Sequence, residues 1–180
     1  MKIGIVAGEA SGDLLGSLLM KALLARHAEL EFFGIAGPRM QGCGAASWYP
    51  MEKLAVRGYV EVLKSWREIA GIRKQLIARF IAEPPDVFIG IDAPDFNLEL
   101  ETALKKRGIP TIHYASPSVW AWRGERIKKI GAAVSKILTL FPFEAPLYEN
   151  AGIPVSYVGH PLAETIPEVP DKEAAREQIR

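Results

Sequence analysis

Short apolar runs alternate along the chain with longer segments whose apolar residues recur every three or four positions. The run at residues 86–91 is bounded by Pro85 and Pro94 and is followed by Asp92 and Asp95. A short apolar run of this kind is typical of a strand buried on both faces, as in the middle of a parallel sheet. Five other runs have strand character, at residues 2–7, 30–35, 110–115, 136–140 and 155–158.

Helical periodicity fills the intervals between these runs. It covers residues 14–26, 58–82, 96–107, 124–130 and 143–151, and we expect a break near Gly71. Strands that alternate with helices in this way predict an α/β fold with a doubly wound, mainly parallel sheet of Rossmann-like type. Ligands of such folds bind outside the carboxyl ends of the strands, so functional residues are expected there.

Two carboxylates follow the strand at residues 86–91. Asp95 comes after Pro94 and before a predicted helix, so we expect it to cap that helix. Asp92 has no such local role. A carboxylate at the carboxyl end of a buried strand lies where ligands bind, so a chemical role for Asp92 stays open.

The loop after the first strand carries candidate substrate-binding residues, namely Gly8, Glu9, Ser11, Gly12 and Asp13. Its glycines match neither G-x-G-x-x-G nor G-x-x-x-x-G-K-[ST], and its two carboxylates would repel a diphosphate. The hydroxyls of a sugar suit this loop better. Turn formation, with Ser11 or Asp13 capping the next helix, is an equal alternative. Ser11 also departs from the G-x-S-x-G nucleophile elbow, which argues against a hydrolase.

Further candidate substrate-binding residues follow later strands. Ser116, Trp120 and Trp122 come after the strand at 110–115, and His160 comes after the last strand. The two tryptophans fit equally well as packing beneath a loop or as a wall for a sugar or acyl chain. His113 lies within a strand, where we expect a satisfied core histidine. No cluster has metal-ligand spacing, so neither a metal nor another cofactor is predicted.

The helical segment at residues 59–70 mixes apolar and basic side chains. Its apolar positions wrap around more than one face, and Lys64 and Arg67 lie among them. Either the helix is buried on most sides or part of its apolar surface faces outward. The candidate membrane or acyl-chain residues are Val60, Val62, Leu63, Trp66 and Ile69.

Composition and charge narrow the class of protein further. The net charge of +1 hides two basic bands, at residues 57–79 and 105–129, but it does not predict a nucleic-acid partner. A single cysteine, Cys43, and the lack of a signal-peptide pattern predict a cytoplasmic protein. No apolar run approaches the roughly 18 residues of a membrane span. A homo-oligomer is compatible with the sequence.

Six stretches resemble the lipid-A-disaccharide synthase family. They are VAGEASGD (6–13), GIAGPRMQ (34–41), MEKLAVRGYVEVL (51–63), GIDAPDFN (90–97), HYASPSVWAWR (113–123) and LFPFE (140–144). The resemblance covers nearly the whole chain in the same order. It implies one half of a GT-B fold, with residues 1–160 as the amino-terminal, acceptor-side domain. Residues 161–180 would then be a linker and the start of an absent nucleotide-sugar-binding domain.

The resemblance also implies an activity. Members of this family are inverting glycosyltransferases that transfer diacylglucosamine from its UDP ester to diacylglucosamine 1-phosphate in lipid A biosynthesis. Asp92 in GIDAPDFN matches the essential aspartate of the family, which implies that Asp92 is the catalytic residue, the single base that takes the proton of the acceptor hydroxyl. Residues 59–70 match its membrane-docking helix, which implies an anionic membrane surface as a partner and a peripheral location on the cytoplasmic face of the inner membrane.

Two other functions stay open at this point. The chain by itself fits a non-catalytic module that binds a lipid-linked sugar. A nucleotide-dependent oxidoreductase of Rossmann type fits less well, because the glycine spacing of the first loop is wrong for it.

Overall fold

The computed structural model describes residues 1–54, 59–117, 124–165 and 176–177, without the side chains of 59–66, 124–125 and 164–165. The strands are β1 (Lys2–Ala7), β2 (Glu31–Ile35), β3 (Ala46–Ser47), β4 (Val87–Ile91), β5 (Thr111–Tyr114), β6 (Lys136–Thr139) and β7 (Val155–Tyr157). The α-helices are α1 (Ala10–Leu24), α2 (Pro38–Gln41), α3 (Tyr59–Ala82), α4 (Pro94–Lys105), α5 (Gly124–Ala133), α6 (Ala145–Glu149) and α7 (Leu162–Thr165). A short 3₁₀-helix, η1 (Met51–Lys53), precedes α3.

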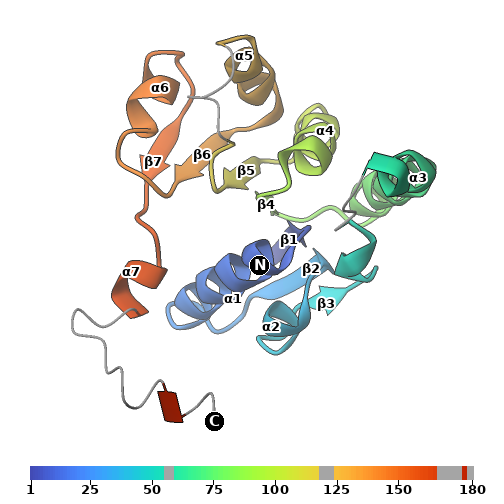
Figure 1. The fold of residues 1–180 in the computed structure, drawn as a ribbon, viewed down its shortest axis with the longest axis horizontal. Coiled ribbons are helices and arrows are strands. Elements are labelled where there is room, and N and C mark those ends of the chain that lie inside the picture. Colours follow the sequence, from blue (N-terminus) through green and yellow to red (C-terminus); the bar gives the residue numbers. More distant parts are fainter. Residues whose placement is uncertain (55–58, 118–123, 166–175, 178–180) are drawn as a thin grey trace.

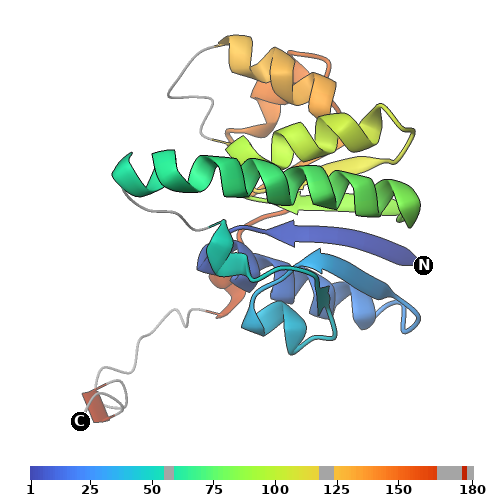
Figure 2. The ribbon, with the colours of Figure 1, turned by 90° about the vertical axis from the view of Figure 1, so that its right-hand side faces the viewer.

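The strands form one parallel sheet in the order β3-β2-β1-β4-β5-β6-β7. Helices α3, α4 and α5 cover one face of the sheet and α1 covers the other (Figure 1). All strands point the same way, so their carboxyl ends share one edge of the molecule (Figure 2). The predicted doubly wound parallel sheet is confirmed, with β3 as an additional short edge strand.

The centre of the sheet is held by the pairing of β1 with β4. Both strands are apolar along their length because helices cover them on both sides, and Ile5 pairs in register with Ile89. Phe88 also contacts Phe80 of α3 edge to face, with ring centroids 5.3 Å apart. The main core therefore lies around these two central strands, and it fixes the loops that leave them.

Helix α3 is continuous from Tyr59 to Ala82, so the predicted break near Gly71 is wrong. A glycine inside a helix costs only about 1 kcal/mol relative to alanine, and packing of the rest of the helix outweighs that cost. Ile72, Leu76 and Phe80 supply this packing, because all three are buried in the main core. The described part of the chain holds no helix that is both long and apolar enough to cross a bilayer.

Both predicted caps are also wrong. Helix α1 begins after Glu9 and has no side-chain cap, so neither Ser11 nor Asp13 caps it. Helix α4 begins after Ala93, which leaves Asp95 inside its first turn. The exposed Asp95 carboxylate instead pairs with Arg126 of α5, with Oδ1 2.9 Å from Nη2.

Candidate active site at the carboxyl ends of β1 and β4

The strand order reverses direction between β1 and β4, and the loops that leave these two strands touch each other. A Cβ on Gly8 would stand 2.7 Å from Cβ of Ala93. A Cβ on Gly12 would stand 3.4 Å from the carbonyl oxygen of Ile91. Gly8 therefore lets the first loop lie directly against the β4 exit, whereas at Gly12, in the first turn of α1, a Cβ would make only an ordinary contact. Such a switch point is where open α/β sheets bind their ligands.

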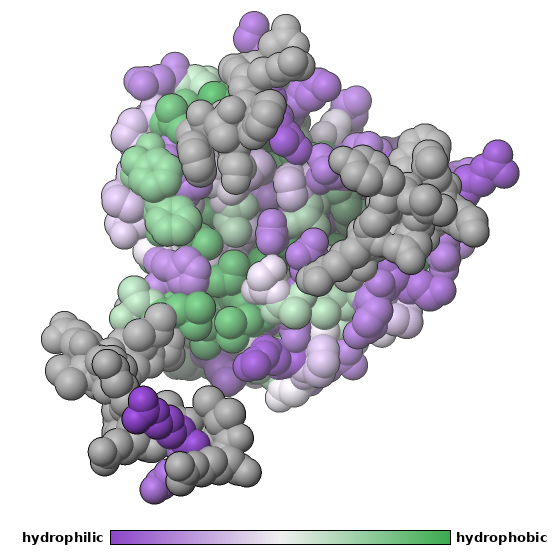
Figure 3. All heavy atoms as spheres, viewed as in Figure 1, coloured by the Kyte–Doolittle hydropathy of each residue, from purple (hydrophilic) through white to green (hydrophobic). Residues whose placement is uncertain are grey.

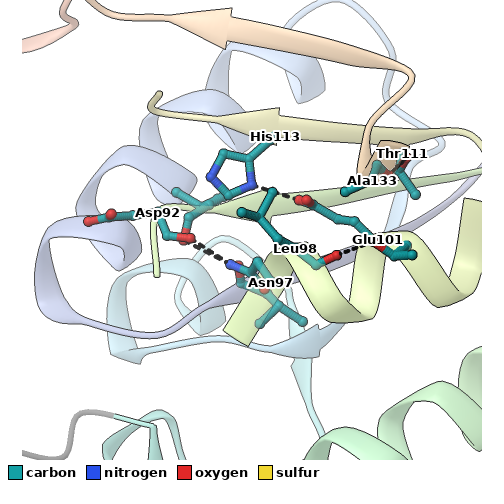
Figure 4. A network of polar contacts seen from close by, with 10 residues as sticks. Asp92, Asn97, Leu98, Glu101, Thr111, His113 and Ala133 are labelled. Atoms are coloured by element: carbon teal, nitrogen blue, oxygen red, sulfur yellow. Dashed lines mark hydrogen bonds and ion pairs between the residues drawn. The ribbon is translucent and has the colours of Figure 1, made fainter. Parts of the chain in front are cut away.

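Asp92 lies at this switch point in an unusual backbone conformation. Its φ is 51° and that of Ala93 is 43°, both in the left-handed region. A non-glycine residue there costs about 1–2 kcal/mol, and such strain clusters at functional sites. Asn97 helps to hold the bend, because its Nδ2 donates to the Asp92 carbonyl oxygen at 2.8 Å. Figure 4 shows the Asp92 carboxylate directed away from this amide.

The first loop brings a hydroxyl to the same carboxylate. Oγ of the exposed Ser11 donates to Oδ2 of Asp92 over a long 3.4 Å. Asp92 itself is half-buried, so its carboxylate remains reachable from outside. Ser11 and Asp92 are 81 residues apart in sequence, and the structure places them together at the carboxyl edge of the sheet.

The two other acidic residues of the first loop, Glu9 and Asp13, differ in their exposure to solvent. Glu9 is exposed at the rim, whereas Asp13 is 3% exposed. Both Asp13 oxygens are engaged by backbone amides at the start of α2, with Arg39 N and Met40 N each 3.0 Å away. Asp13 thus stabilises the contact between α1 and α2. This structural role was not predicted from the sequence.

The exit of β5 repeats the bend seen at β4. Ala115 has a φ of 72°, and the half-buried Ser116 follows it. Oγ of Ser116 lies 2.7 Å from the hydroxyl of the buried Tyr148. Burial raises the pKa of Tyr148, and the nearby Glu144 raises it too, while the Ser116 hydrogen bond and Arg126 oppose them. Trp120 and Trp122, which were predicted to bind substrate together with Ser116, lie outside the described residues.

His160 occupies the same rim after β7, but farther along the sheet. Strand β7 is three places from β4, about 14 Å at the usual strand spacing, so His160 does not join Asp92 in one cluster. It lies beside an aromatic pair, with its ring centroid 6.2 Å from Phe141, which stacks on Phe143. Several exposed apolar side chains lie nearby: the two phenylalanines follow β6, Tyr157 ends β7 and Val158 follows it. Figure 3 shows apolar residues gathered on this side of the carboxyl-terminal face.

Sequence reasoning did not single out Asn97, Tyr148 or the Phe141–Phe143 pair. The apolar stretch LFPFE directly after a strand is a signal that could have indicated the aromatic pair. Tyr148 carried no such signal, because a tyrosine in a helix of mixed character is ordinary. The described residues contain no group of three or more His, Cys, Asp or Glu placed to hold a metal ion.

The predicted membrane residues are only partly described. The side chains of Val60, Val62, Leu63 and Trp66 lie outside the described set, although their backbone belongs to α3. Ile69 is half-buried and packs against the main core. Core packing therefore accounts for the apolar character of Ile69 without a membrane.

Comparison with known proteins decides the family. The profile described as lipid-A-disaccharide synthetase matches residues 3–180. The chain belongs to the lipid-A-disaccharide synthase family. It is 62% identical to the lipid-A-disaccharide synthase of Chromobacterium violaceum and 60% identical to that of Aromatoleum aromaticum. Both alignments cover 99% of this chain and 46% of the relative, so the chain spans about half the length of these relatives.

Solved structures of distant proteins agree on the fold. The chain resembles MurG of Acinetobacter baumannii with a TM-score of 0.50 and 12% identity, over 79% of this chain and 41% of MurG. It resembles a UGT transferase of Siraitia grosvenorii, solved in complex with UDP, with a TM-score of 0.52 and 12% identity. That match covers 99% of this chain and 54% of the transferase. The Rossmann-like half of a GT-B fold is therefore confirmed for this member of the lipid-A-disaccharide synthase family.

Proposed function

We propose that this chain is the acceptor-binding half of an inverting glycosyltransferase of lipid A biosynthesis. The donor is the UDP ester of 2,3-diacylglucosamine and the acceptor is 2,3-diacylglucosamine 1-phosphate. Family membership supports the reaction class. The observation that carries the local assignment is the meeting of Ser11 and Asp92 at the β1–β4 switch point, 3.4 Å apart.

Asp92 acts as the general base in this proposal. Its carboxylate takes the proton of the acceptor hydroxyl as that oxygen bonds to the anomeric carbon of the donor. The bond between that carbon and the diphosphate oxygen breaks at the same time, and UDP leaves with the bonding electrons. One displacement inverts the anomeric centre, so a single carboxylate suffices.

The residues around Asp92 bind the acceptor sugar. Ser11 and Glu9 offer side-chain oxygens at the exposed rim, Gly8 keeps the loop close to Ala93 beside Asp92, and Gly12 adds no side chain at the start of α1. Asp13 is left out of this set because its carboxylate already binds the amides of α2. Ser116 and His160 extend the site along the rim, with Trp120 and Trp122 as further contacts to the sugar or acyl chains.

Binding at a membrane completes the proposal. The acyl chains of both substrates place them in a bilayer, and the apolar and basic residues of the amino-terminal part of α3 suit its interface. Val60, Val62, Leu63 and Trp66 would enter the acyl boundary on the cytoplasmic face of the inner membrane. Residues 1–160 would be the acceptor-side domain, and 161–180 would lead to the domain that binds the nucleotide.

The test is an assay of UDP release with both acylated sugars. The chain is joined to the carboxyl-terminal half of the Chromobacterium violaceum relative, because it spans only 46% of that protein. We expect UDP release that requires both substrates, and none from the 180-residue chain alone. Binding of the lipid-linked sugar without any transfer by the joined protein would favour a binding module instead.

A further inference from the structure

A group of buried polar side chains lies beneath the exits of β4 and β5. Asn97 and Glu101 come from α4 and His113 comes from β5, and all three are fully buried. Figure 4 shows them side by side between the helix and the sheet, directly behind Asp92. None of them is accessible to a substrate, so their effect on any reaction has to pass through Asp92.

Glu101 and His113 form a pair that packs onto the backbone of β4. Oε1 of Glu101 lies 2.8 Å from Nδ1 of His113. Gly90 pairs in register with His113, and a Cβ on Gly90 would stand 2.2 Å from Oε1 of Glu101. A glycine at 90 therefore allows the carboxylate to rest on β4 only two residues before Asp92.

Asn97 acts on the bend itself. Its amide nitrogen lies 2.8 Å from the carbonyl oxygen of Asp92 and 3.3 Å from that of Ile91. These are the carbonyls on either side of the point where β4 turns into its left-handed exit. A single amide group thus links α4 to the end of the strand and to the strained residue that follows it.

Fold stability alone does not account for this polar group. Asn97 Oδ1, Glu101 Oε2 and His113 Nε2 are three of the four buried side-chain polar atoms without a partner among the described residues. Burying such atoms is unfavourable, and replacing a buried charged pair by apolar residues of similar size is often neutral or stabilising. A fully apolar contact between α4 and the sheet would hold the fold equally well, but it could not bind the Asp92 carbonyl.

We propose that Asn97 and the Glu101–His113 pair are positioning residues that keep Asp92 in its left-handed conformation and so aim its carboxylate at the acceptor hydroxyl. The proposal deepens the function proposed above and rests on it for the role of Asp92. The geometric part, that these residues set the backbone of Asp92, stands independently of the reaction.

The test uses two variants and one matched control. Asn97→Leu keeps a similar volume but removes the donor, and the double variant Glu101→Leu with His113→Phe removes the pair without leaving one partner unmatched. Thr102→Val is the control, because Thr102 lies on the same helix and its hydroxyl donates to the Leu98 carbonyl of that helix at 2.7 Å, away from Asp92. Each is measured for melting temperature, for the NMR backbone shifts of Asp92 and Ala93, and, in the joined protein, for kcat and KM.

We expect the double variant to keep its melting temperature while its Asp92 and Ala93 shifts leave the left-handed range. In the joined protein kcat should fall about 10- to 100-fold, with KM for the acceptor within a few-fold, because misplacing a reacting group by about 1 Å has an effect of this size. Asn97→Leu should move the same shifts and lower kcat by a similar factor, but with a lower melting temperature, because the carbonyl acceptors of its amide lose their donor. Thr102→Val should behave like the unaltered protein.

Two results would overturn the proposal. One is unchanged Asp92 and Ala93 shifts in both folded variants. The other is an unchanged kcat in variants whose shifts do move. If the double variant does not fold, Asn97→Leu decides the question by the same shifts. If Asp92→Asn itself transfers sugar normally, the proposed base is wrong, while the shifts still report whether Asn97 and the pair position this residue.

Discussion

Asp13 lies so close to Gly37 that a Cβ on Gly37 would stand 2.4 Å from the Asp13 carboxylate carbon. The contact exists because the carboxylate reaches across from α1 to bind the first amides of α2. Gly37 leaves room for it at the carboxyl end of β2. Together, Asp13 and Gly37 hold in place the loop that connects β2 to α2.

Asp13→Ala should lower the free energy of unfolding by about 2–3 kcal/mol, because it removes charged acceptors from buried amides. Gly37→Ala should also destabilise, since the new methyl group displaces the carboxylate. Urea unfolding at neutral pH measures both. Glu9→Ala is the matched control, because Glu9 is an exposed acid four residues away on the same turn of chain. A midpoint for Asp13→Ala equal to that of Glu9→Ala would show that the bonds to α2 contribute nothing.

Asp92→Asn should reduce kcat of the joined protein about 10²- to 10⁴-fold, as expected for the loss of a general base. The melting temperature should hardly change, because the amide occupies the same half-buried space. Asp95→Asn is the matched control, since Asp95 is exposed and only pairs with Arg126 at the surface. We expect this control to keep normal turnover. Equal activity of the two variants would remove Asp92 as the base.

Val60→Ser, Leu63→Ser and Trp66→Ser in one variant should weaken binding to anionic vesicles with little change in melting temperature. The reason is that an interfacial helix binds through exposed apolar side chains, which contribute little to the core. Co-sedimentation with vesicles and thermal unfolding measure the two effects. Ile72→Ser serves as the contrast, because Ile72 is buried on the same helix and its loss should lower the melting temperature instead. A triple variant that melts early but still binds vesicles would place the segment in the core.

The buried Tyr148 predicts a loss of stability at alkaline pH. Burial raises its folded-state pKa above the ordinary value of 10.0, so the folded protein retains a proton that the unfolded chain loses. The resulting stability is fully present below pH 10 and is lost as the pH rises through the folded-state pKa. Tyr148→Phe should make the alkaline fall less steep without abolishing it, because burial also raises the pKa of Tyr114. Urea unfolding from pH 8 to 11 tests this, and an identical fall in the variant would contradict it.

Six of the strands and the longer helices could be predicted from the sequence, because short apolar runs alternate regularly with segments of helical periodicity. The short elements β3, η1, α2 and α7 are too brief to give such a pattern. The strand at residues 86–91 and its polar exit were recognisable because the apolar run Val87-Phe88-Ile89 is followed closely by the polar residue Asp92. The two caps could not be assigned, because each depends on contacts from outside the helix concerned. Asp13 is drawn to α2 and Asp95 to Arg126, and neither partner is near in sequence. Local preference decides where a helix starts only when nothing farther along the chain competes for the side chain.

Some features of the candidate site could likewise be expected from the sequence, and others could not. The meeting of Ser11 with Asp92 follows from the rule that parallel strands end at one edge, so it could be expected. His113 is buried as predicted, but it is not fully satisfied, because its Nε2 has no partner among the described residues. Its pairing with Glu101 could not be foreseen. A glutamate on a helix normally faces water, and here it is buried because Gly90 leaves space for it. A space left by a glycine in the preceding strand has no signature in the sequence around Glu101.

The pairing of β1 with β4 also determines the order in which the sheet can form during synthesis. Lys2 and Asp86, which meet through a hydrogen bond from the Lys2 amide, are 84 residues apart. While β4 is still inside the ribosome, β1 can pair only with β2, and its other edge stays open and apolar. Pairings between such distant segments form slowly, so we expect the apolar edge of β1 to stay exposed on the emerging chain until β4 leaves the ribosome. A nascent chain arrested before residue 87 should therefore be bound by chaperones, and one with β4 fully emerged should release them.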